Sequence, residues 1–239
     1  MLALPFMGSV FAAFLPSKAR DAAGLLAGAV ALAGTLLAIY LYGGIATGGV
    51  VRSQLQWLPS FGLNPSLRLD GLTWLFAMLV LGIGFLVVLY ARYYMSPADP
   101  VPRFFSYLLA FMGSMLGLVL SGNLVQLAFF WELTSLFSFL LIGYWYHNES
   151  ARSGARMALI VTATGGFCLL LGVLVIGRIA GSYEVDVVLA SAAAIQAHPL
   201  YLPALLLILV GAFTKSAQFP FHFWLPHAMA AEARTTSTS

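Results

Sequence analysis

The sequence predicts an all-α polytopic membrane protein with about seven transmembrane helices, and two observations predict this class. Hydrophobic residues make up 61% of the 239 residues and charged residues only 8%, with a mean hydropathy of +0.94, whereas soluble domains carry roughly a quarter charged residues to face water. Several uncharged stretches also approach or exceed the ~20 residues that a helix needs to cross the hydrocarbon core. The solvent of most of this chain is therefore expected to be lipid.

The first, second, third and sixth helices follow from runs without a charged residue. The N-terminal run is only 15 residues long, and a cleaved signal peptide is the alternative to a short first helix. Signal peptides carry positive charge before the apolar region, whereas Lys18 and Arg20 follow it here, so a first transmembrane helix is favoured. The four runs are residues 1–15, 22–51, 71–91 and 157–177.

The fourth, fifth and seventh helices follow from two longer runs. Residues 104–148 hold one charge, Glu132, and the Ser-Gly-Asn sequence at 121–123 is a natural turn that divides the run into two helices. Residues 187–231 hold one charge, Lys215, and give one helix followed by a broken segment. The seven expected helices span residues 2–15, 22–43, 71–91, 104–120, 123–146, 157–178 and 201–225.

Lysine and arginine in the loops predict the orientation of the helices, since cytoplasmic loops carry an excess of these residues. With the N-terminus outside, the inside loops hold Lys18, Arg20, Arg92, Arg103, Arg152 and Arg156, and the outside loops hold Arg52, Arg68 and Arg178. The net charge of +3 and the pI near 9.1 are therefore explained by basic loop residues that orient the helices in the membrane. Binding to nucleic acid is not indicated, because the basic residues are sparse and lie between apolar runs.

The chain shows no sequence pattern typical of a metal or cofactor site. Cys168 is its one cysteine and lies in an apolar run, so neither a disulfide framework nor a zinc site of the usual spacing is available. Small residues at 162–166 lie within a predicted helix, where they favour close helix packing. We expect no cofactor, no metal and no nucleic-acid partner.

Two charged residues lie deep in the predicted spans and are the candidates for function. Glu132 stands ten residues from the start of the fifth helix, close to the bilayer midplane, and Lys215 lies at a similar depth in the seventh. A charge at that depth costs ~2.5–3.5 kcal/mol on insertion scales, so it usually faces the bundle interior and a partner. The alternative is an ion pair that only joins two helices, although desolvation usually offsets the attraction within such a pair.

Polar residues accompany the two charges. Ser135 lies one turn from Glu132 on the fifth helix. On the seventh, Lys215, Gln218 and His222 have the helical spacing i, i+3 and i+7, which suits a chain of buried waters. A change in the separation or hydration of the two charges would change how tightly the lysine holds its proton. His222 could extend this relay because imidazole changes protonation near neutral pH, and a histidine that is only packed or hydrogen-bonded is the alternative.

Two prolines predict a break in the seventh helix. Pro220 and Pro226 lack the amides that would bond to the carbonyls four residues earlier. Irregular backbone at membrane depth is tolerated only where it lines a cavity or is buried in protein. The seventh helix is therefore expected to break just after Lys215.

Three motifs resemble a known family. Residues 129–136 read FFWELTSL and continue as SFLLIGYW at 138–145, residues 211–229 read GAFTKSAQFPFHFWLPHAM, and residues 67–72 read LRLDGL. Together they are similar to the antiporter-like subunit family, which includes proton-pumping subunits of respiratory complex I and subunits of Mrp-type multisubunit cation/proton antiporters. The WELTSL sequence is most similar to the large A subunit of the Mrp antiporter. The resemblance covers most of residues 55–231.

This resemblance implies a site, a location and partners. It implies that Glu132 and Lys215 form the family's coupled pair at the start of a proton path along the membrane midplane. It also implies two inverted five-helix repeats, the bacterial-type inner cell membrane as the location, and other membrane subunits as partners. The corresponding division of the chain is three transmembrane helices at 1–103, a partial antiporter-like repeat at 104–231 and a polar tail at 232–239. Because the tail stands where the family continues with an eighth helix, an N-terminal part of the subunit is expected.

Three functions remain as hypotheses. The first is the N-terminal part of a Mrp-type antiporter A subunit, which exchanges Na⁺ (or K⁺) for H⁺ and is a transporter subunit rather than an enzyme. The second is a proton-translocating membrane subunit of a complex I-like or hydrogenase-type oxidoreductase, whose redox centres would lie on other chains. The third is a truncated fragment that does not transport. Neighbouring genes would separate the first two hypotheses.

Overall fold

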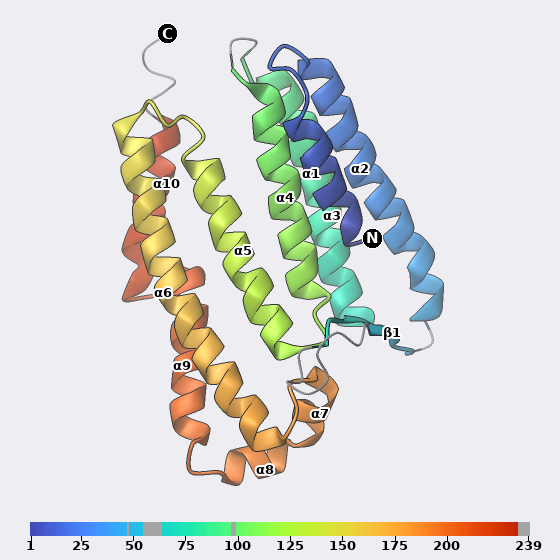
Figure 1. Cartoon of the computed structure of the whole chain (residues 1–239), viewed down its shortest axis with the longest axis vertical. Helices are drawn as coiled ribbons and strands as arrows, with labels where there is room; N and C mark the ends of the chain where they lie inside the picture. The colour runs from blue at the N-terminus through green and yellow to red at the C-terminus, as the bar shows by residue number, and fades with distance from the viewer. Residues whose placement is uncertain (47, 55–63, 97–98, 234–239) are drawn as a thin grey trace. The chain divides into compact units, whose positions relative to one another are not determined.

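The chain is mostly helical and divides into two compact units (Figure 1). The computed structural model describes residues 1–46, 48–54, 64–96 and 99–233. The two units are Met1–Ser53 with Leu67–Leu120, and Gln54–Ser66 with Ser121–Ser239.

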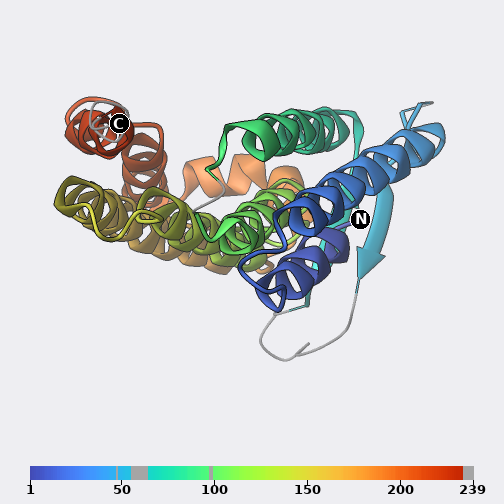
Figure 2. The ribbon, with the colours of Figure 1, turned by 90° about the horizontal axis from the view of Figure 1, so that it is seen from above.

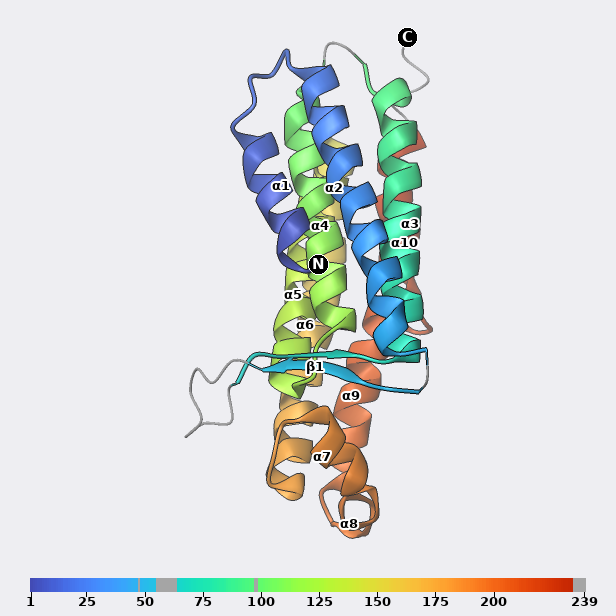
Figure 3. The same cartoon turned by 90° about the vertical axis from the view of Figure 1, so that its right-hand side faces the viewer.

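The first unit is a bundle of helices with a core of small residues. Its helices are α1 (Ala3–Ala13), α2 (Arg20–Leu41), α3 (Gly71–Tyr94) and α4 (Val101–Val119). α1 lies against α4 and α2, and α2 runs beside α3 (Figures 2 and 3). The buried face of α2 carries only alanine and glycine, so its neighbours approach closely. A Cβ on Gly34, for example, would fall 2.7 Å from the Leu81 side chain on α3.

The connection between α2 and α3 contains structure that the sequence did not predict. A short 3-10 helix, η1 (Tyr42–Gly44), is followed by strands β1 (Val51–Gln54) and β2 (Ser66–Leu69), which pair as a two-stranded sheet (Figure 3). α3 then begins with a capping box. The Asp70 carboxylate accepts a hydrogen bond from the Thr73 N–H at 2.8 Å, and the Thr73 hydroxyl accepts one from the Asp70 N–H at 2.7 Å.

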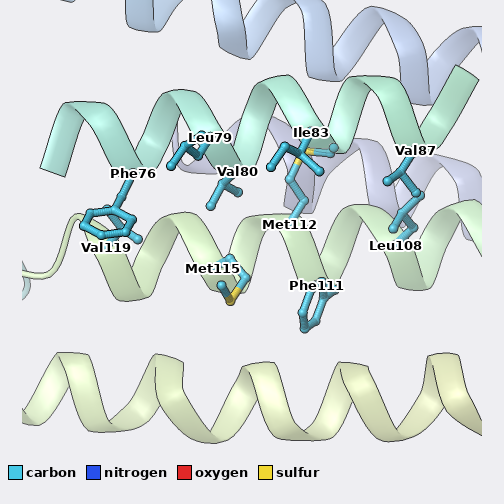
Figure 4. Close-up of a pocket in the computed structure, with 11 residues that line it drawn as sticks. Phe76, Leu79, Val80, Ile83, Val87, Leu108, Phe111, Met112, Met115 and Val119 are labelled. Atoms are coloured by element: carbon cyan, nitrogen blue, oxygen red, sulfur yellow. The ribbon is translucent and has the colours of Figure 1, made fainter. Parts of the chain in front are cut away.

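A pocket of about 350 Å³ lies between α3 and α4 of the first unit (Figure 4). Phe76 and Ile83 line it from α3, and Met112 and Met115 line it from α4. All of its lining side chains are apolar, and one lining residue is glycine. The pocket therefore offers no group that could bind an ion or carry a proton.

The second unit is built on one long helix, α6. Its elements are α5 (Leu124–Ile142), α6 (Glu149–Ala180), α7 (Val185–Ala190), α8 (Ala192–Ala197), α9 (Tyr201–Lys215), η3 (Phe221–Phe223) and α10 (Trp224–Ala233). At 32 residues, α6 is about 48 Å long. α5, α9 and α10 all pack against it, and Figure 1 shows α9 beside its C-terminal half and α10 beside its N-terminal half.

Each of the seven expected helices has a counterpart, and the predicted fold class is confirmed. Five of the described helices are long and apolar enough to cross a membrane, whereas α1 and α9 have only 11 and 15 residues. α6 begins at Glu149, eight residues before the expected start, because the polar segment before the apolar run is also helical. Its first turn is capped by the Asn148 side chain, which accepts a hydrogen bond from the Ser150 N–H.

The predicted boundaries of the repeat and of the tail stay predictions. The compact units part between Leu120 and Ser121, because α4 packs against the first three helices. Compactness and membership of a repeat are different properties, so this division does not test the boundary at 103/104. Within the predicted tail, residues 234–239 lie outside the described residues, and α10 extends to Ala233.

Candidate functional site

α5 presents two faces that carry different polar groups. The helix begins at an Asn123 cap, whose side chain accepts hydrogen bonds from two N–H groups of the first turn. Further along, Trp131, Thr134 and Ser135 follow the spacing i, i+3 and i+4, which places them on one face. Glu132 is rotated by about 100° from Trp131 around the helix axis. The glutamate and the two hydroxyls therefore point to different neighbours.

The Lys215 ammonium group is held by three oxygen atoms of α5. Its Nζ donates to the Ser135 hydroxyl at 2.6 Å, to the Thr134 hydroxyl at 2.7 Å and to the Trp131 carbonyl at 3.1 Å. A lysine ammonium has three donors, so these contacts satisfy all of them. Lys215 is also the last residue of α9, where the helix dipole favours a positive charge.

Glu132 has a different environment, against α6. Its Oε1 atom is buried and has no hydrogen-bond partner among the described residues. A Cβ on Gly166 of α6 would fall 1.4 Å from this oxygen, so the carboxyl group lies directly on the glycine. No described hydrogen bond or ion pair within 4.0 Å joins Glu132 to Lys215. The coupling of the two charges stays a prediction.

The structure does not place Gln218 and His222 on one helical face with Lys215. α9 ends at Lys215 and Ala217 has a left-handed φ of 50°, so the expected i, i+3 and i+7 spacing does not apply beyond the lysine. Both side chains are exposed, and no described hydrogen bond joins either of them to Lys215. His222 instead stacks on the Phe219 ring, with 5.9 Å between ring centroids. Their relay role stays a prediction.

The two prolines have different positions at the end of α9. Pro220 lies in the irregular segment between α9 and η3, and its peptide bond with Phe219 is cis. Pro226 is the third residue of α10, where the missing amide would have no partner within the helix. Pro226 therefore lies in the first turn of a new helix rather than in the interrupted segment.

Thr134 is the site residue that sequence reasoning did not single out. It is fully buried, donates its hydroxyl hydrogen to the Trp131 carbonyl at 2.7 Å and accepts from Lys215. A threonine and a serine side by side, one turn from a buried charge, are the signal that could have identified both. Because hydroxyls in helices usually bond to their own backbone, this signal is weak without the neighbouring helix.

Comparisons with known proteins match two parts of the chain to two related family models. Residues 121–238 match a family model described as NADH:quinone oxidoreductase/Mrp antiporter, TM. Residues 57–105 match one described as the N-terminus of chain 5 of NADH-ubiquinone oxidoreductase (complex I). The chain belongs to this antiporter-like subunit family. The family predicted from the motifs is therefore confirmed.

Relatives of this antiporter-like chain carry antiporter names. A protein of Rhizobium meliloti (strain 1021), named as the probable A/B subunit of a K(+)/H(+) antiporter, is 61% identical over 228 residues, which are 95% of this chain and 23% of that protein. The A subunit of a Na(+)/H(+) antiporter from Alkalihalophilus pseudofirmus is 48% identical over 187 residues, which are 78% of this chain and 23% of that protein. The chain thus spans 23% of the length of both curated relatives.

Solved structures show the same fold. A chain of the Mrp complex from Dietzia sp. DQ12-45-1b has a TM-score of 0.84 at 34% identity, over 95% of this chain and 24% of that one. A chain of the membrane-bound sulfane sulfur reductase, an archaeal respiratory membrane complex, has a TM-score of 0.77 at 21% identity, over 95% of this chain and 35% of that one. The second likeness concerns the fold alone.

Proposed function

We propose that this chain works in a multisubunit membrane complex that exchanges Na⁺ or K⁺ for H⁺, and that Glu132 and Lys215 are its proton-transfer residues. The observation that carries the proposal is the environment of the two side chains. Three oxygens of one helical turn of α5 bind the Lys215 ammonium of α9, and the same turn carries Glu132, whose buried carboxyl oxygen has no partner among the described residues. A proton donor and a proton acceptor thus meet the same turn of α5, on different faces.

Proton transfer between Lys215 and Glu132 removes or restores both buried charges together. When the Lys215 ammonium gives a proton to the Glu132 carboxylate, one N–H bond breaks, one O–H bond forms, and both side chains become neutral. The three oxygen acceptors on α5 stabilise the charged lysine, because hydrogen bonds to a charged group are stronger than those to a neutral one. Loss of these contacts therefore favours transfer, and their return favours the charged pair.

The cation and the complex are supported by the relatives. The Rhizobium relative is named for K⁺ and the Alkalihalophilus relative for Na⁺, so the exchanged cation is one of these two in our proposal. The similar Dietzia chain belongs to a Mrp complex, and we propose other membrane subunits as partners. The proposed location is the bacterial inner cell membrane, with the N-terminus outside.

The proposal is tested by transport in membrane vesicles that carry the full-length protein with its partner subunits. Cation-dependent proton movement is measured with a pH-sensitive dye, separately for Na⁺ and K⁺. Glu132→Ala and Lys215→Ala are each expected to abolish the signal. Glu149→Gln, which changes an exposed carboxylate at the start of α6, is the control and should transport normally. Full transport by either site variant would overturn the site assignment.

A further inference from the structure

Two adjacent glycines of α6 face two different polar side chains, Thr214 of α9 and Glu132 of α5. A Cβ on Gly165 would fall 1.7 Å from the Thr214 hydroxyl oxygen and 2.7 Å from the Thr214 Cβ, on α9. A Cβ on Gly166 would fall 1.4 Å from Glu132 Oε1 and 2.6 Å from its Cδ, on α5. Ordinary contacts of a Cβ begin at about 3.4 Å. The volume that any side chain at position 166 would occupy is therefore filled by the carboxyl group of Glu132.

Gly166 differs in this respect from three other glycines in the buried face of α6. These three approach the main chain or apolar parts of their neighbours, as expected for close helix packing. Gly154 faces the His227 carbonyl, Gly172 faces Ile208 and the Ala204 carbonyl, and Gly177 faces the Tyr183 ring. At position 166 alone among these, the nearest atom is a carboxyl oxygen of the proposed proton-transfer pair.

We propose that Gly166 is a positioning residue for Glu132. Because it has no side chain, it leaves the space in which the carboxyl group lies against α6. The rest of that environment supports the same conclusion, since Oε1 is buried without a hydrogen-bond partner among the described residues. Shape, and not a hydrogen bond to this oxygen, therefore determines where Oε1 lies. The inference rests on the proposed role of Glu132 in proton transfer and extends it to α6.

The geometry predicts that an alanine at position 166 changes the site more than the fold. The atoms in its way are Oε1 and Cδ, at the far end of a side chain that can rotate, and the next contact is Trp131 Cδ1 at 3.3 Å. The carboxyl group can move while α5 and α6 keep their places. At position 165 the obstacle includes the Thr214 Cβ, which is bonded to the main chain, so α9 itself would have to move.

The experiment is a double-mutant cycle in the full-length protein with its partner subunits, measured in vesicles. The variants are Gly166→Ala, Glu132→Asp, both together, and Glu132→Ala. Gly166→Ala is expected to lower cation-dependent proton transport at least about tenfold, within the range that a misplacement of about 1 Å produces in enzyme sites. Its abundance in the membrane and its thermal unfolding should stay close to wild type. Aspartate is one methylene shorter and withdraws from the new Cβ, so the double variant should transport at least as well as Gly166→Ala alone.

Gly172→Ala is the packing control. Its Cβ would fall 2.6 Å from the Ile208 side chain and 3.0 Å from the Ala204 carbonyl oxygen on α9, so it should lower stability, and Glu132→Asp should not improve its transport. Three outcomes would overturn the inference while the proposed function stands. They are wild-type transport by Gly166→Ala, misfolding of that variant, or a transport loss in the double variant equal to the product of the losses in the two single variants. Transport by Glu132→Ala would instead overturn the proposed function, and the inference with it.

Discussion

At the scale of single residues, three oxygen atoms of α5 take the place of water around the Lys215 ammonium group. Two of them are hydroxyls of buried side chains, Thr134 and Ser135. A buried ammonium without such partners would carry a large desolvation penalty. The Trp131 ring adds a contact, with Nζ 5.6 Å from its centroid. The position of the lysine charge is therefore set by α5 and not by the Glu132 carboxylate alone.

The Thr134 hydroxyl offers the most direct test of this arrangement. Thr134→Val keeps the shape of the side chain and removes one acceptor of the Lys215 ammonium. A hydrogen bond to a charged group contributes about 1.5–3 kcal/mol, which corresponds to a roughly tenfold to hundredfold change in an equilibrium. We expect transport to fall by at least about tenfold while the protein still folds and assembles.

The matched control for this variant is Thr162→Val on α6. Thr162 is also buried, and its hydroxyl donates to the Ala158 carbonyl of its own helix at 2.8 Å. Its loss should lower transport little. Equal losses from the two threonine variants would show that any buried hydroxyl matters, and the specific role of Thr134 would be rejected.

The sequence identified the charged members of the site but not the partners that position them. Glu132 and Lys215 stand out because charges are scarce within the spans, and Ser135 follows from its spacing. Thr134 gives only the weak signal of a hydroxyl beside Ser135, and Gly166 gives none, since threonine and glycine are common in apolar helices. Which helix each faces depends on how α5, α6 and α9 pack, and this is a property of three dimensions.

At the scale of elements, the end of α9 depends on contacts from the segment that follows it. The last carbonyls of a helix have no partner within the helix. Two of these carbonyls have partners beyond Ser216: the Trp224 indole N–H donates to the Thr214 carbonyl at 2.9 Å, and the Gln218 N–H donates to that of Phe213 at 2.9 Å. The interrupted segment and the first residue of α10 thus supply hydrogen bonds that a continuous helix would have made.

Trp224→Phe tests this support for the end of α9. The variant keeps an aromatic ring but leaves the Thr214 carbonyl without its donor, which is expected to cost about 1–3 kcal/mol. Thermal unfolding of the purified protein in detergent should show a lower Tm. Transport should fall as well, because Thr214 precedes Lys215. Trp145→Phe, which changes a tryptophan in the loop between α5 and α6, is the control and should have the smaller effect; an equal fall in Tm would contradict the prediction.

The start of α3 gives a prediction about pH. Burial alone would raise the pKa of the Asp70 carboxyl. The hydrogen bonds from Thr73 and the nearby Arg68 charge lower it by more than burial raises it, so the pKa lies below the ordinary value of 3.8. A carboxyl with a lower pKa in the folded state stabilises the fold at pH values above the ordinary pKa. This contribution is lost as the pH falls through the folded-state pKa. Asp70 lies just outside the α3 span.

Asp70→Ala should therefore destabilise the protein in a pH-dependent manner. The loss of an N-cap carboxylate is expected to cost about 0.5–2 kcal/mol at pH 7. The difference from wild type should shrink as the pH is lowered below the ordinary pKa, since the wild-type carboxylate becomes protonated as well. Thermal unfolding across this range measures the effect, and Asp70→Asn, which keeps an oxygen acceptor, should lose less. A difference that is constant with pH would exclude the charge as the cause.

Hydropathy was enough to predict the long membrane helices, but not the short elements of the fold. Long apolar runs such as that of α3 define membrane helices, and turn residues separate α4 from α5. The strands β1 and β2 have only four residues each, too few for an alternating pattern to be recognised. The start of α6 was placed late because Arg152 and Arg156 interrupt the apolar run although the backbone there is helical.

At the scale of the whole molecule, α6 connects the chemistry of the site to the orientation of the protein. Its length of about 48 Å exceeds the ~30 Å of the hydrocarbon core, so its two ends are expected to lie on opposite sides of the membrane. Arg152 and Arg156 lie near its N-terminal end, whereas Glu184 and Asp186 follow its C-terminal end. Two arginines at the N-terminal end against one, Arg178, in the last turn lead the positive-inside rule to predict that the N-terminal end lies in the cytoplasm.

Labelling of single cysteines tests this orientation. Cys168→Ser removes the one cysteine of these 239 residues, and His147→Cys and Gln196→Cys then place an exposed thiol near either end of α6. With the N-terminus outside, a membrane-impermeant maleimide added to intact cells should label position 196 and leave position 147 unlabelled. Both positions should react after the cells are made permeable, which controls for access of the reagent. Labelling of position 147 alone in intact cells would contradict the predicted orientation and support the opposite one, with the N-terminus inside.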